Sequence, residues 1–230
     1  MFPLILNNHV RPIMRPNSLP LGVNVGLTGG IGSGKSIVAQ LLVEQGAALV
    51  DLDAIAHDLT AAGGRAMTLI EGAFGRQVVS DDGALNRRAM RDLVFNDAHN
   101  KARLEAIIHP LILSTAIELA HSMARNAPMC VLYDIPLLAR SAEWLQLLDW
   151  VVVVDCAEEV RRQRIRARSP HLTEEMIHQI ISSQASASEM KSIANAVLDN
   201  TENDVKHLQL KGQVNILAGY IRRINSSCTK

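Results

Sequence analysis

The stretch Gly29-Gly30-Ile31-Gly32-Ser33-Gly34-Lys35-Ser36 decides the fold of this chain. It matches the pattern G-x-x-x-x-G-K-[S/T], in which glycines let backbone N–H groups curl around phosphates. The lysine of this pattern reaches the β- and γ-phosphates, and the final hydroxyl, here that of Ser36, is a Mg²⁺ ligand. The pattern requires a strand before the loop and a helix after it, and both are expected, at 23–27 and 35–45. The sequence therefore predicts a P-loop that binds a nucleoside triphosphate.

Four further apolar runs have the length and composition of buried strands. Because strand, loop, helix and strand follow one another from residue 23 to residue 50, the chain begins with the unit that builds a parallel sheet. Near-continuous apolar runs suit strands that are covered on both faces. We therefore expect an α/β P-loop nucleotide-binding fold, with a mainly parallel sheet flanked by helices. The four runs are 47–50, 129–134, 150–155 and 196–199.

An all-helical pattern separates the second expected strand from the third. We expect residues 21–61 and 128–224 to form the nucleotide-binding core and residues 62–127 to form a helical substrate-binding insertion. Residues 1–20 carry four prolines and are expected to be a loose leader before the fold. Within the insertion, Pro110 is expected to interrupt the helical run. The expected helices are about 86–96, 97–108 and 111–125 in the insertion, and 201–224 at the end of the core.

The overall composition argues against several classes of partner. The 230 residues include 23 Lys plus Arg and 23 Asp plus Glu, so net charge favours neither nucleic acid nor an anionic membrane. Aromatic residues make up 3% of the chain, too few for a base-stacking surface. Three widely spaced cysteines give no disulfide framework, so we expect a cytoplasmic protein. No run of about 18 apolar residues predicts a membrane-spanning helix. A monomer and a small homo-oligomer both remain open.

Acidic residues follow two of the expected strands. Asp51 and Asp53 come at the end of the run 47–50, where open α/β sheets bind ligands. Residues two apart on an extended segment point the same way, so a carboxylate here can accept a proton from an attacking hydroxyl. The alternative is a cap for the following helix. Asp134 ends the next strand, where it either holds a magnesium-bound water or caps the turn at Pro136.

Basic residues gather on one charged helix, where five arginines fall within eight positions. Arg161, Arg164 and Arg168 share one face of this helix. A phosphoryl-transfer enzyme needs cations that close over the phosphates and neutralise developing charge. The alternatives are a solvated helix face or a nucleic-acid patch, and the neutral, aromatic-poor composition argues against the patch. His109 precedes Pro110, which disfavours a helical conformation, so His109 either meets an anionic ligand or marks a helix boundary.

Beyond the P-loop, the chain carries, in this order, Asp51-Leu52-Asp53, the segment 82–87, Val94-Phe95, the segment 109–112, Pro136-Leu137-Leu138, the strand 151–155, the arginine helix, Gln184 and Leu198-Asp199-Asn200. In order and spacing, the chain resembles the dephospho-CoA kinase family over about residues 23 to 200. Enzymes of this family use ATP to phosphorylate the ribose 3′-hydroxyl of dephospho-coenzyme A. The resemblance therefore implies this activity, which is the last step of coenzyme A biosynthesis.

The resemblance also implies roles for individual residues. Asp53 would be the catalytic base and contact the substrate, while Arg87 and His109 would hold dephospho-CoA against the helical insertion. Residues 161–185 would form a helical lid, with Arg164 and Arg168 as its phosphate-facing cations. ATP and Mg²⁺ would be the cofactors, with Ser36 as metal ligand. The expected ATP contacts are Gly30, Ile31, Gly32, Ser33, Gly34, Lys35, Ser36 and Ile37, with Asn200 near the adenine.

Three positions depart from the expected pattern. Ile37 stands where many P-loop kinases carry Thr, Arg140 where the family usually has Glu, and Asn195 where it usually has Asp. Two other functions are compatible with a P-loop: another small-molecule kinase, of the nucleoside monophosphate type, or a nucleotide-dependent switch protein. The helical insertion and the Asp-x-Asp segment favour dephospho-CoA kinase over these two alternatives. A GTPase switch would show an Asn-Lys-x-Asp segment, and an Asp-x-x-Gly after the third strand, and the sequence has neither.

Overall fold

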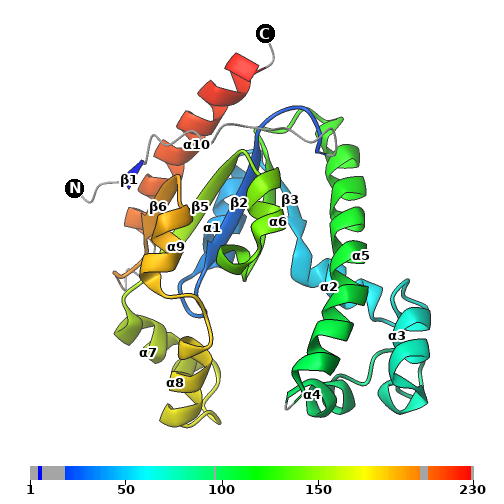
Figure 1. Cartoon of the computed structure of the whole chain (residues 1–230). Coiled ribbons are helices and arrows are strands. Elements are labelled where there is room, and N and C mark those ends of the chain that lie inside the picture. Colours follow the sequence, from blue (N-terminus) through cyan, green and yellow to red (C-terminus); the bar gives the residue numbers. More distant parts are fainter. Residues whose placement is uncertain (1–4, 7–18, 96, 203–206, 229–230) are drawn as a thin grey trace. The chain divides into compact units, whose positions relative to one another are not determined.

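A computed structural model describes residues 5–6, 19–95, 97–202 and 207–228 of the chain (Figure 1). It is a mixed α/β structure built on one six-stranded sheet, which confirms the predicted fold class. The chain divides into two compact units, one formed by residues 1–50 together with 120–230 and the other by residues 51–119. The first unit contains the P-loop, and the second is helical.

The sheet consists of β1 (Ile5–Leu6), β2 (Asn24–Gly29), β3 (Ala48–Asp51), β4 (Val131–Asp134), β5 (Trp150–Asp155) and β6 (Ala196–Asp199). Their order in the sheet is β1-β6-β5-β2-β4-β3. β2 pairs in parallel with β4 and β5, and β5 pairs in parallel with β6. The register sets Leu27 opposite Asp134 and Asp155 opposite Asp199. The carboxyl ends of these strands therefore lie along one edge, where α/β folds bind ligands.

The strand β1 lies within the segment that we expected to be a loose leader. It pairs antiparallel with β6, with Ile5 opposite Val197 and Leu6 opposite Ala196. β1 therefore adds a short strand to the edge of the sheet, next to β6. The remainder of the expected leader, at 1–4 and 7–18, lies outside the described residues.

Two helices, α1 (Lys35–Glu44) and α10 (Leu208–Cys228), cover one face of the sheet. The side chains of Leu27 and Val152 on the strands pack with Leu42 of α1 and Leu217 of α10, and all four are fully buried. Burying each such side chain stabilises the fold by roughly 1.5–3 kcal/mol. α10 begins at Leu208, later than the expected start near residue 201. The hydroxyl of Thr201 instead donates to the Asp199 carboxylate at 2.6 Å, which holds it in a turn.

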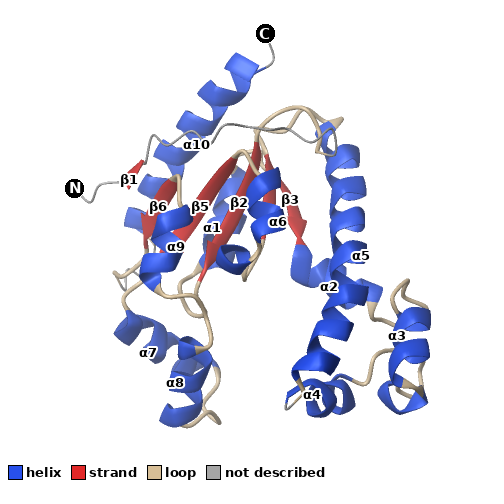
Figure 2. Cartoon of the chain, viewed as in Figure 1, coloured by secondary structure: helices blue, strands red, loops and turns tan. Residues whose placement is uncertain are grey.

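The opposite face carries α6 (Ala142–Leu147), the short turn η2 (Leu138–Arg140) and α9 (Ala187–Ile193), as Figure 2 shows. The rings of Tyr133 and Trp144 lie 5.5 Å apart between the sheet and α6. A Cβ atom at Gly26 would collide with the side chains of Leu138 and Leu148. Glycine at this position of β2 therefore lets η2 approach the sheet closely.

A pair of helices, α7 (Glu158–Arg168) and α8 (Glu174–Ser182), follows β5, and both match the sequence-based expectation. The Thr173 side chain caps α8 by accepting a hydrogen bond from the Met176 N–H at 3.2 Å. The two helices share a small apolar core of Ile165, Ile177 and Ile181. Figure 1 shows this pair beyond the carboxyl ends of β5 and β6.

The unit 51–119 contains α2 (Leu52–Leu59), α3 (Met67–Phe74), the turn η1 (Arg76–Val78), α4 (Arg87–Phe95) and most of α5 (Ala98–Ala124). The predicted interruption at Pro110 is wrong, because α5 runs continuously through it. Proline removes one backbone donor from a helix, and the hydrogen bonds and packing of a 27-residue helix outweigh that loss. The expectation that His109 is non-helical is wrong for the same reason.

The helix α5 also has the length and mean hydropathy, 1.3 over its most apolar 18 residues, of a membrane-spanning segment. Only 11% of that stretch is buried. Length and composition alone are weak evidence for a membrane span. The helix also carries Glu118, whose exposed side chain forms an ion pair with Arg65 at 3.5 Å.

Candidate active site

The P-loop connects β2 to α1 through a tight turn that requires glycine at several of its positions. Gly32 and Gly34 have φ angles of 77° and 90°, which L side chains rarely adopt. A Cβ atom at Gly30 would collide with the guanidinium of Arg161, and one at Gly34 would collide with the amide of Asn200. The glycines thus satisfy two constraints, the backbone turn and the close approach of side chains from two other segments.

Backbone N–H groups of this loop form a site for anions. The N–H groups of Gly32, Gly34, Lys35 and Ser36 have no hydrogen-bond acceptor within the described part of the chain. They lie at and just before the N-terminus of α1, where the helix dipole favours negative charge. The Ile31 N–H differs, because it donates to the side-chain oxygen of Gln184 at 3.0 Å. Four of the expected phosphate contacts are therefore open, and the Ile31 N–H is already paired.

Lys35, the invariant cation of the motif, pairs with Asp134 at the carboxyl end of β4. Their side chains are 16% and 12% exposed, so the pair is largely shielded from bulk water. The Lys35 ammonium group thus lies beside the loop with a carboxylate next to it. The sequence left two roles open for Asp134, holding a magnesium-bound water or capping the turn at Pro136. The ion pair with Lys35 adds a third role.

Asn200 and Ile37 contact the loop in ways that the sequence did not reveal. The Asn200 amide donates to the Ser33 carbonyl oxygen at 2.7 Å, and both residues are buried. Its expected position near adenine stays a prediction. The Ile37 N–H donates to the Gly34 carbonyl oxygen at 3.0 Å, so it is paired within the loop and not free for phosphate. The Ile37 side chain packs against the core between the sheet and α1.

The arginines of α7 divide into three groups. Arg164 donates to the Gly32 carbonyl oxygen at 3.3 Å, which places its guanidinium beside the P-loop, and its expected contact with phosphate stays a prediction. Arg161 also reaches the loop and donates to the Ile31 carbonyl oxygen at 2.9 Å. Arg168 is exposed, and its side chain has no hydrogen bond or ion pair with any described residue. Arg162 and Arg166 pair with Glu174 of α8.

Burial and charge oppose one another around these arginines. Burial lowers the pKa of Arg161, while Cys156, Glu158 and Asp155 act to raise it. Burial raises the pKa of the Cys156 thiol, and the nearby Arg164 and Arg161 act to lower it. Arg164 donates to the Cys156 sulfur at 3.4 Å. Cys156 is therefore a packed thiol beside the cations.

Asp51 and Asp53 do not lie on one extended segment, so the expectation that they point the same way is wrong. α2 begins at Leu52, directly after β3. Asp51 is the N-cap of α2, and its carboxylate accepts from the Ala54 N–H at 3.0 Å. Asp53 lies exposed in the first turn of the helix. Helix capping therefore accounts for Asp51 and leaves the Asp53 carboxylate available to a ligand.

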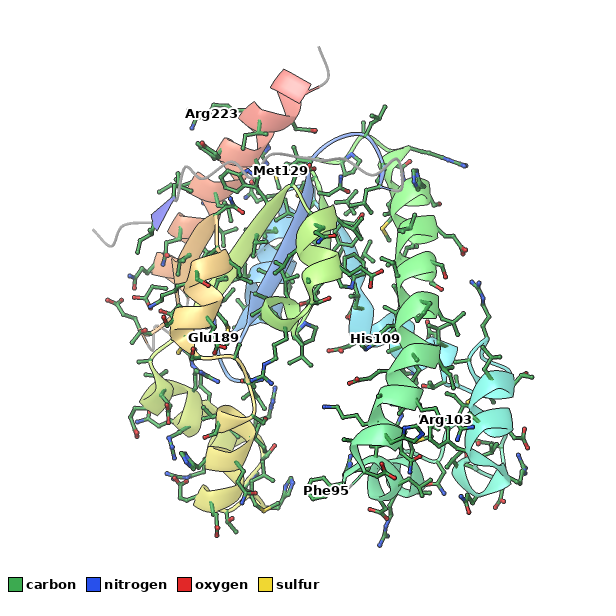
Figure 3. The ribbon with its side chains drawn as sticks, in the orientation of Figure 1. Phe95, Arg103, His109, Met129, Glu189 and Arg223 are labelled. Atoms are coloured by element: carbon green, nitrogen blue, oxygen red, sulfur yellow. The ribbon has the colours of Figure 1, made fainter. Side chains whose placement is uncertain are left out.

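The two residues expected to bind the substrate, Arg87 and His109, belong with Asp53 to the unit 51–119. Arg87, the first residue of α4, donates to the Thr60 hydroxyl at 3.0 Å. His109 projects from α5, as Figure 3 shows, and is exposed. Near the end of α4, the Phe95 ring is 80% exposed (Figure 3). This unit thus presents cationic and aromatic side chains to its surroundings.

The positions that depart from the family's usual pattern have structural partners. Asn195 is buried, its side-chain oxygen accepts from the Val151 N–H at 2.9 Å, and its own N–H donates to the Val151 carbonyl oxygen at 2.8 Å. It therefore extends the pairing between β5 and the segment before β6. Arg140 donates to the Ser183 carbonyl oxygen at 2.9 Å, just after α8. The sequence contained no signal for these partners, since all three bonds are long-range.

Comparisons with known proteins show the family to which this chain belongs. The family described as dephospho-CoA kinase matches residues 23–206. The dephospho-CoA kinase of Albidiferax ferrireducens is 44% identical over 189 residues, which cover 82% of this chain and 89% of that protein. That of Dechloromonas aromatica is 45% identical over 193 residues, covering 84% and 90%. A crystal structure of a Thermus thermophilus protein, 32% identical, superposes with a TM-score of 0.73 over 87% of this chain and 98% of that one. The chain belongs to the dephospho-CoA kinase family.

Proposed function

We propose that this protein transfers the terminal phosphoryl group of ATP to the ribose 3′-hydroxyl of dephospho-CoA, which gives coenzyme A and ADP in the last step of coenzyme A biosynthesis. The observation that carries the proposal is a P-loop with four open N–H groups and two arginines on its backbone, in a chain of this family. Phosphoryl transfer depends on positioning and electrostatic stabilisation, and this loop supplies both.

Binding of the phosphates is assigned to the open N–H groups of Gly32, Gly34, Lys35 and Ser36, with Ser33 and Gly30 shaping the loop. The Lys35 ammonium group is assigned to the β- and γ-phosphates, as the motif requires. Its ion pair with Asp134 keeps it beside the loop before the nucleotide arrives. These groups are fixed before the reaction, so they lose little reorganisation energy as charge develops on the transferred phosphoryl group.

The donor set around the loop fits Mg²⁺. Magnesium prefers oxygen ligands and is commonly held by one or two protein oxygens together with substrate phosphates. The Ser36 hydroxyl lies exposed at the start of α1, and the Asp134 carboxylate lies at the carboxyl end of β4. We assign Ser36 as the metal ligand and Asp134 as a partner of its water shell. Bound Mg²⁺ would neutralise charge on the β- and γ-phosphates.

The lid cations are assigned to α7. Arg164 already lies beside the Gly32 carbonyl, and Arg168 follows it by four residues on the same helix face. Arg168 has no partner among the described residues, so its guanidinium can meet a phosphate oxygen without first breaking an ion pair. Both would stabilise the negative charge of the transition state.

We assign Asp53 as the general base that accepts the proton of the 3′-hydroxyl. Asp51 is engaged in capping, while Asp53 is exposed and free of that role. The 3′-hydroxyl oxygen then attacks the γ-phosphorus as the bond to the ADP oxygen breaks, and the proton moves to the Asp53 carboxylate. A positioned base of this kind contributes on the order of 10²- to 10⁴-fold to rate.

Binding of dephospho-CoA is assigned to the helical unit, through Arg87, His109 and Asp53. Arg87 offers a cation, and His109 offers a ring N–H donor, for the phosphates of the substrate. The balanced charge of the chain supports an enzyme without nucleic-acid or membrane partners. Its three widely spaced cysteines support a cytoplasmic location. We propose a monomer or a small homo-oligomer as its working state.

The decisive experiment is mass detection of product after incubation with ATP, Mg²⁺ and dephospho-CoA. We expect an increase in substrate mass by one phosphoryl group, and loss of product when the Ser36→Ala variant replaces the parent protein. A parallel panel of nucleoside monophosphates tests the other kinase class. Phosphorylation of a nucleoside monophosphate, with none of dephospho-CoA, would overturn the proposal. Slow ATP hydrolysis unaffected by any small acceptor would favour a switch protein.

A further inference from the structure

Both ends of the α7–α8 pair converge on one residue of the P-loop, Ile31. At the start of α7, the Arg161 Nε donates to the Ile31 carbonyl oxygen at 2.9 Å. Just after α8, the Gln184 Oε1 accepts from the Ile31 N–H at 3.0 Å. The same Oε1 accepts from the Arg161 Nη2 at 3.0 Å. Three hydrogen bonds therefore close a ring through Ile31, Arg161 and Gln184, which we name the Ile31 clasp.

The side chain of Ile31 strengthens this convergence. It packs against the apolar core of the helix pair, formed by Ile165, Ile177 and Ile181. The backbone of Ile31 is therefore held by hydrogen bonds at the base of the helix pair, while its side chain is held by the interior of the same pair. Gly30 completes the contact, because a Cβ atom there would displace the Arg161 guanidinium. Loop and helix pair are thus packed as one body.

A second bond holds the C-terminal end of the helix pair. Arg140, in η2, donates to the carbonyl oxygen of Ser183, the residue before Gln184. This bond is exposed, so it contributes little by itself. Its effect is to anchor the segment that carries Gln184 to the turn after β4. The segment that carries Gln184 is therefore held by η2 as well as by its bonds within the clasp.

We propose that Arg161 and Gln184 are positioning residues of the phosphoryl-transfer site, which act through Ile31. By taking up the N–H and the carbonyl of Ile31, they fix the orientation of the peptide units that lead into Gly32. The open N–H groups of Gly32 and Gly34 are then presented to phosphate in a set geometry. The clasp also fixes the base of α7, and with it the position of Arg164 beside the Gly32 carbonyl.

Gln184 allows a sharp test, because its side chain takes part in the clasp only as an acceptor. In Gln184→Glu, a carboxylate oxygen can accept both hydrogen bonds, whereas in Gln184→Leu a side chain of similar size accepts neither. We expect Gln184→Leu to lower ATP affinity and kcat by about tenfold or more, while Gln184→Glu stays within about threefold of the parent protein. KM for dephospho-CoA should not change.

Arg161 is tested with charge held constant. Arg161→Lys keeps a cation but cannot bond Ile31 and Gln184 together through a planar fork. If Arg161 acts by charge alone, Arg161→Lys restores activity relative to Arg161→Met. If it acts through the clasp, Arg161→Lys fails to restore it, which is the result that we expect. The double variant with Gln184→Leu should lose little more than either single variant, because both remove one unit.

Matched controls come from the same helix. Gln163→Leu removes an exposed glutamine that bonds only Glu159, and Arg162→Met removes an arginine that bonds within the helix pair. Both controls should keep the parent ATP affinity. Hydrogen–deuterium exchange gives a readout that needs no acceptor substrate. In Gln184→Leu the amides of residues 30–36 and 158–168 should exchange faster, while those of β4 and α10 stay as in the parent.

This inference rests on the kinase reaction proposed above, but ATP affinity and amide exchange test it even if dephospho-CoA is not the acceptor. Parent-like ATP affinity and exchange in folded Gln184→Leu would overturn it. Equal loss in Gln184→Glu and Gln184→Leu would also overturn it, because the acceptor oxygen would then be irrelevant. If Gln184→Leu does not fold, the comparison of Gln184→Glu with the parent, together with Arg161→Lys, decides the question by the same measurements.

Discussion

The Asn200 side chain, directly after β6, holds the P-loop: its amide donates to the Ser33 carbonyl oxygen at 2.7 Å, across 167 positions of sequence. Asn200 comes directly after β6, and its own N–H donates to the Asp155 carbonyl oxygen at 2.9 Å. The bond is buried, so water does not compete with it. β5, β6 and the loop are therefore tied together at the carboxyl edge of the sheet.

This bond predicts different effects for two substitutions at Asn200. In Asn200→Asp, an acceptor replaces the donor and faces the Ser33 carbonyl oxygen, so a buried charge would be left without a donor there. We expect this variant to weaken ATP binding more than Asn200→Ala, and to lower the melting temperature further, since an unpaired buried polar group costs about 1–3 kcal/mol or more. Calorimetric ATP titration and thermal unfolding measure both. Exposed Asn126→Asp is the control, and a smaller effect of Asn200→Asp than of Asn200→Ala would contradict the assignment.

Replacing glycine by alanine should have opposite effects in the P-loop and in the helix α3. Gly34→Ala places a Cβ against the Asn200 amide at a positive φ, so we expect ATP binding to be lost. Gly72 lies in α3, and a Cβ atom added there would have no neighbour within 4 Å, so Gly72→Ala is free of clashes. That control should raise stability by about 0.5–1 kcal/mol through helix propensity and unfolded-state entropy. Intact ATP binding in Gly34→Ala would show that the close contact is not required.

The two acids at the start of α2 should behave differently. Asp53→Asn should lower kcat by about 100-fold or more, with ATP affinity changed less than about threefold, because a base acts on the acceptor. Asp51→Asn keeps a capping oxygen and should leave kcat largely unchanged. Steady-state kinetics and ATP titration test the pair. Comparable losses of turnover and ATP binding in Asp53→Asn would mean that Asp53 is a ligand contact or a structural residue.

The lid arginines can be separated by stability as well as by rate. Arg168→Ala should lower kcat by about tenfold without changing the melting temperature, because Arg168 has no described partner to lose. Arg164→Ala should lower both kcat and the melting temperature, since it also removes the bond to the Gly32 carbonyl oxygen. Arg166→Ala, which breaks only the ion pair with Glu174, is the control for rate. Unchanged kcat in Arg168→Ala would remove this residue from the site.

Alkaline stability should depend on Cys130. Burial raises the pKa of its thiol from an ordinary 9.0 to about 12. Because the folded pKa is the higher one, the stabilising contribution is complete below pH 9 and is lost as the pH rises from 9 towards 12, at about 1.4 kcal/mol per pH unit at most. Cys130→Ala should therefore be less stable than the parent at pH 8 and lose less stability between pH 9 and 11. Denaturant unfolding at each pH tests this, and parallel losses in both proteins would contradict it.

How far the sequence reached is clearest at the loop and its surroundings. The spacing from Gly29 to Ser36 predicted the strand–loop–helix unit, because that backbone turn has a local cause in its glycines. The two helices of the α7–α8 pair, with the Thr173 cap, also have local causes. The predicted interruption at Pro110 was wrong because the cost of a proline is local, whereas the stability of α5 comes from the whole helix. The expectation that Asp51 and Asp53 point the same way was wrong because α2 begins between them and sets the direction of each carboxylate.

The sequence alone determined that this chain carries a P-loop on a parallel sheet, since short-range glycine geometry and apolar periodicity suffice for that. The tertiary structure decided which side chains hold the loop. Arg161, Gln184 and Asn200 lie more than 120 residues from the backbone groups they bind, and no spacing rule connects residues so far apart. Their partners are fixed by the strand order of the sheet, which brings the ends of β5 and β6 next to the loop after β2.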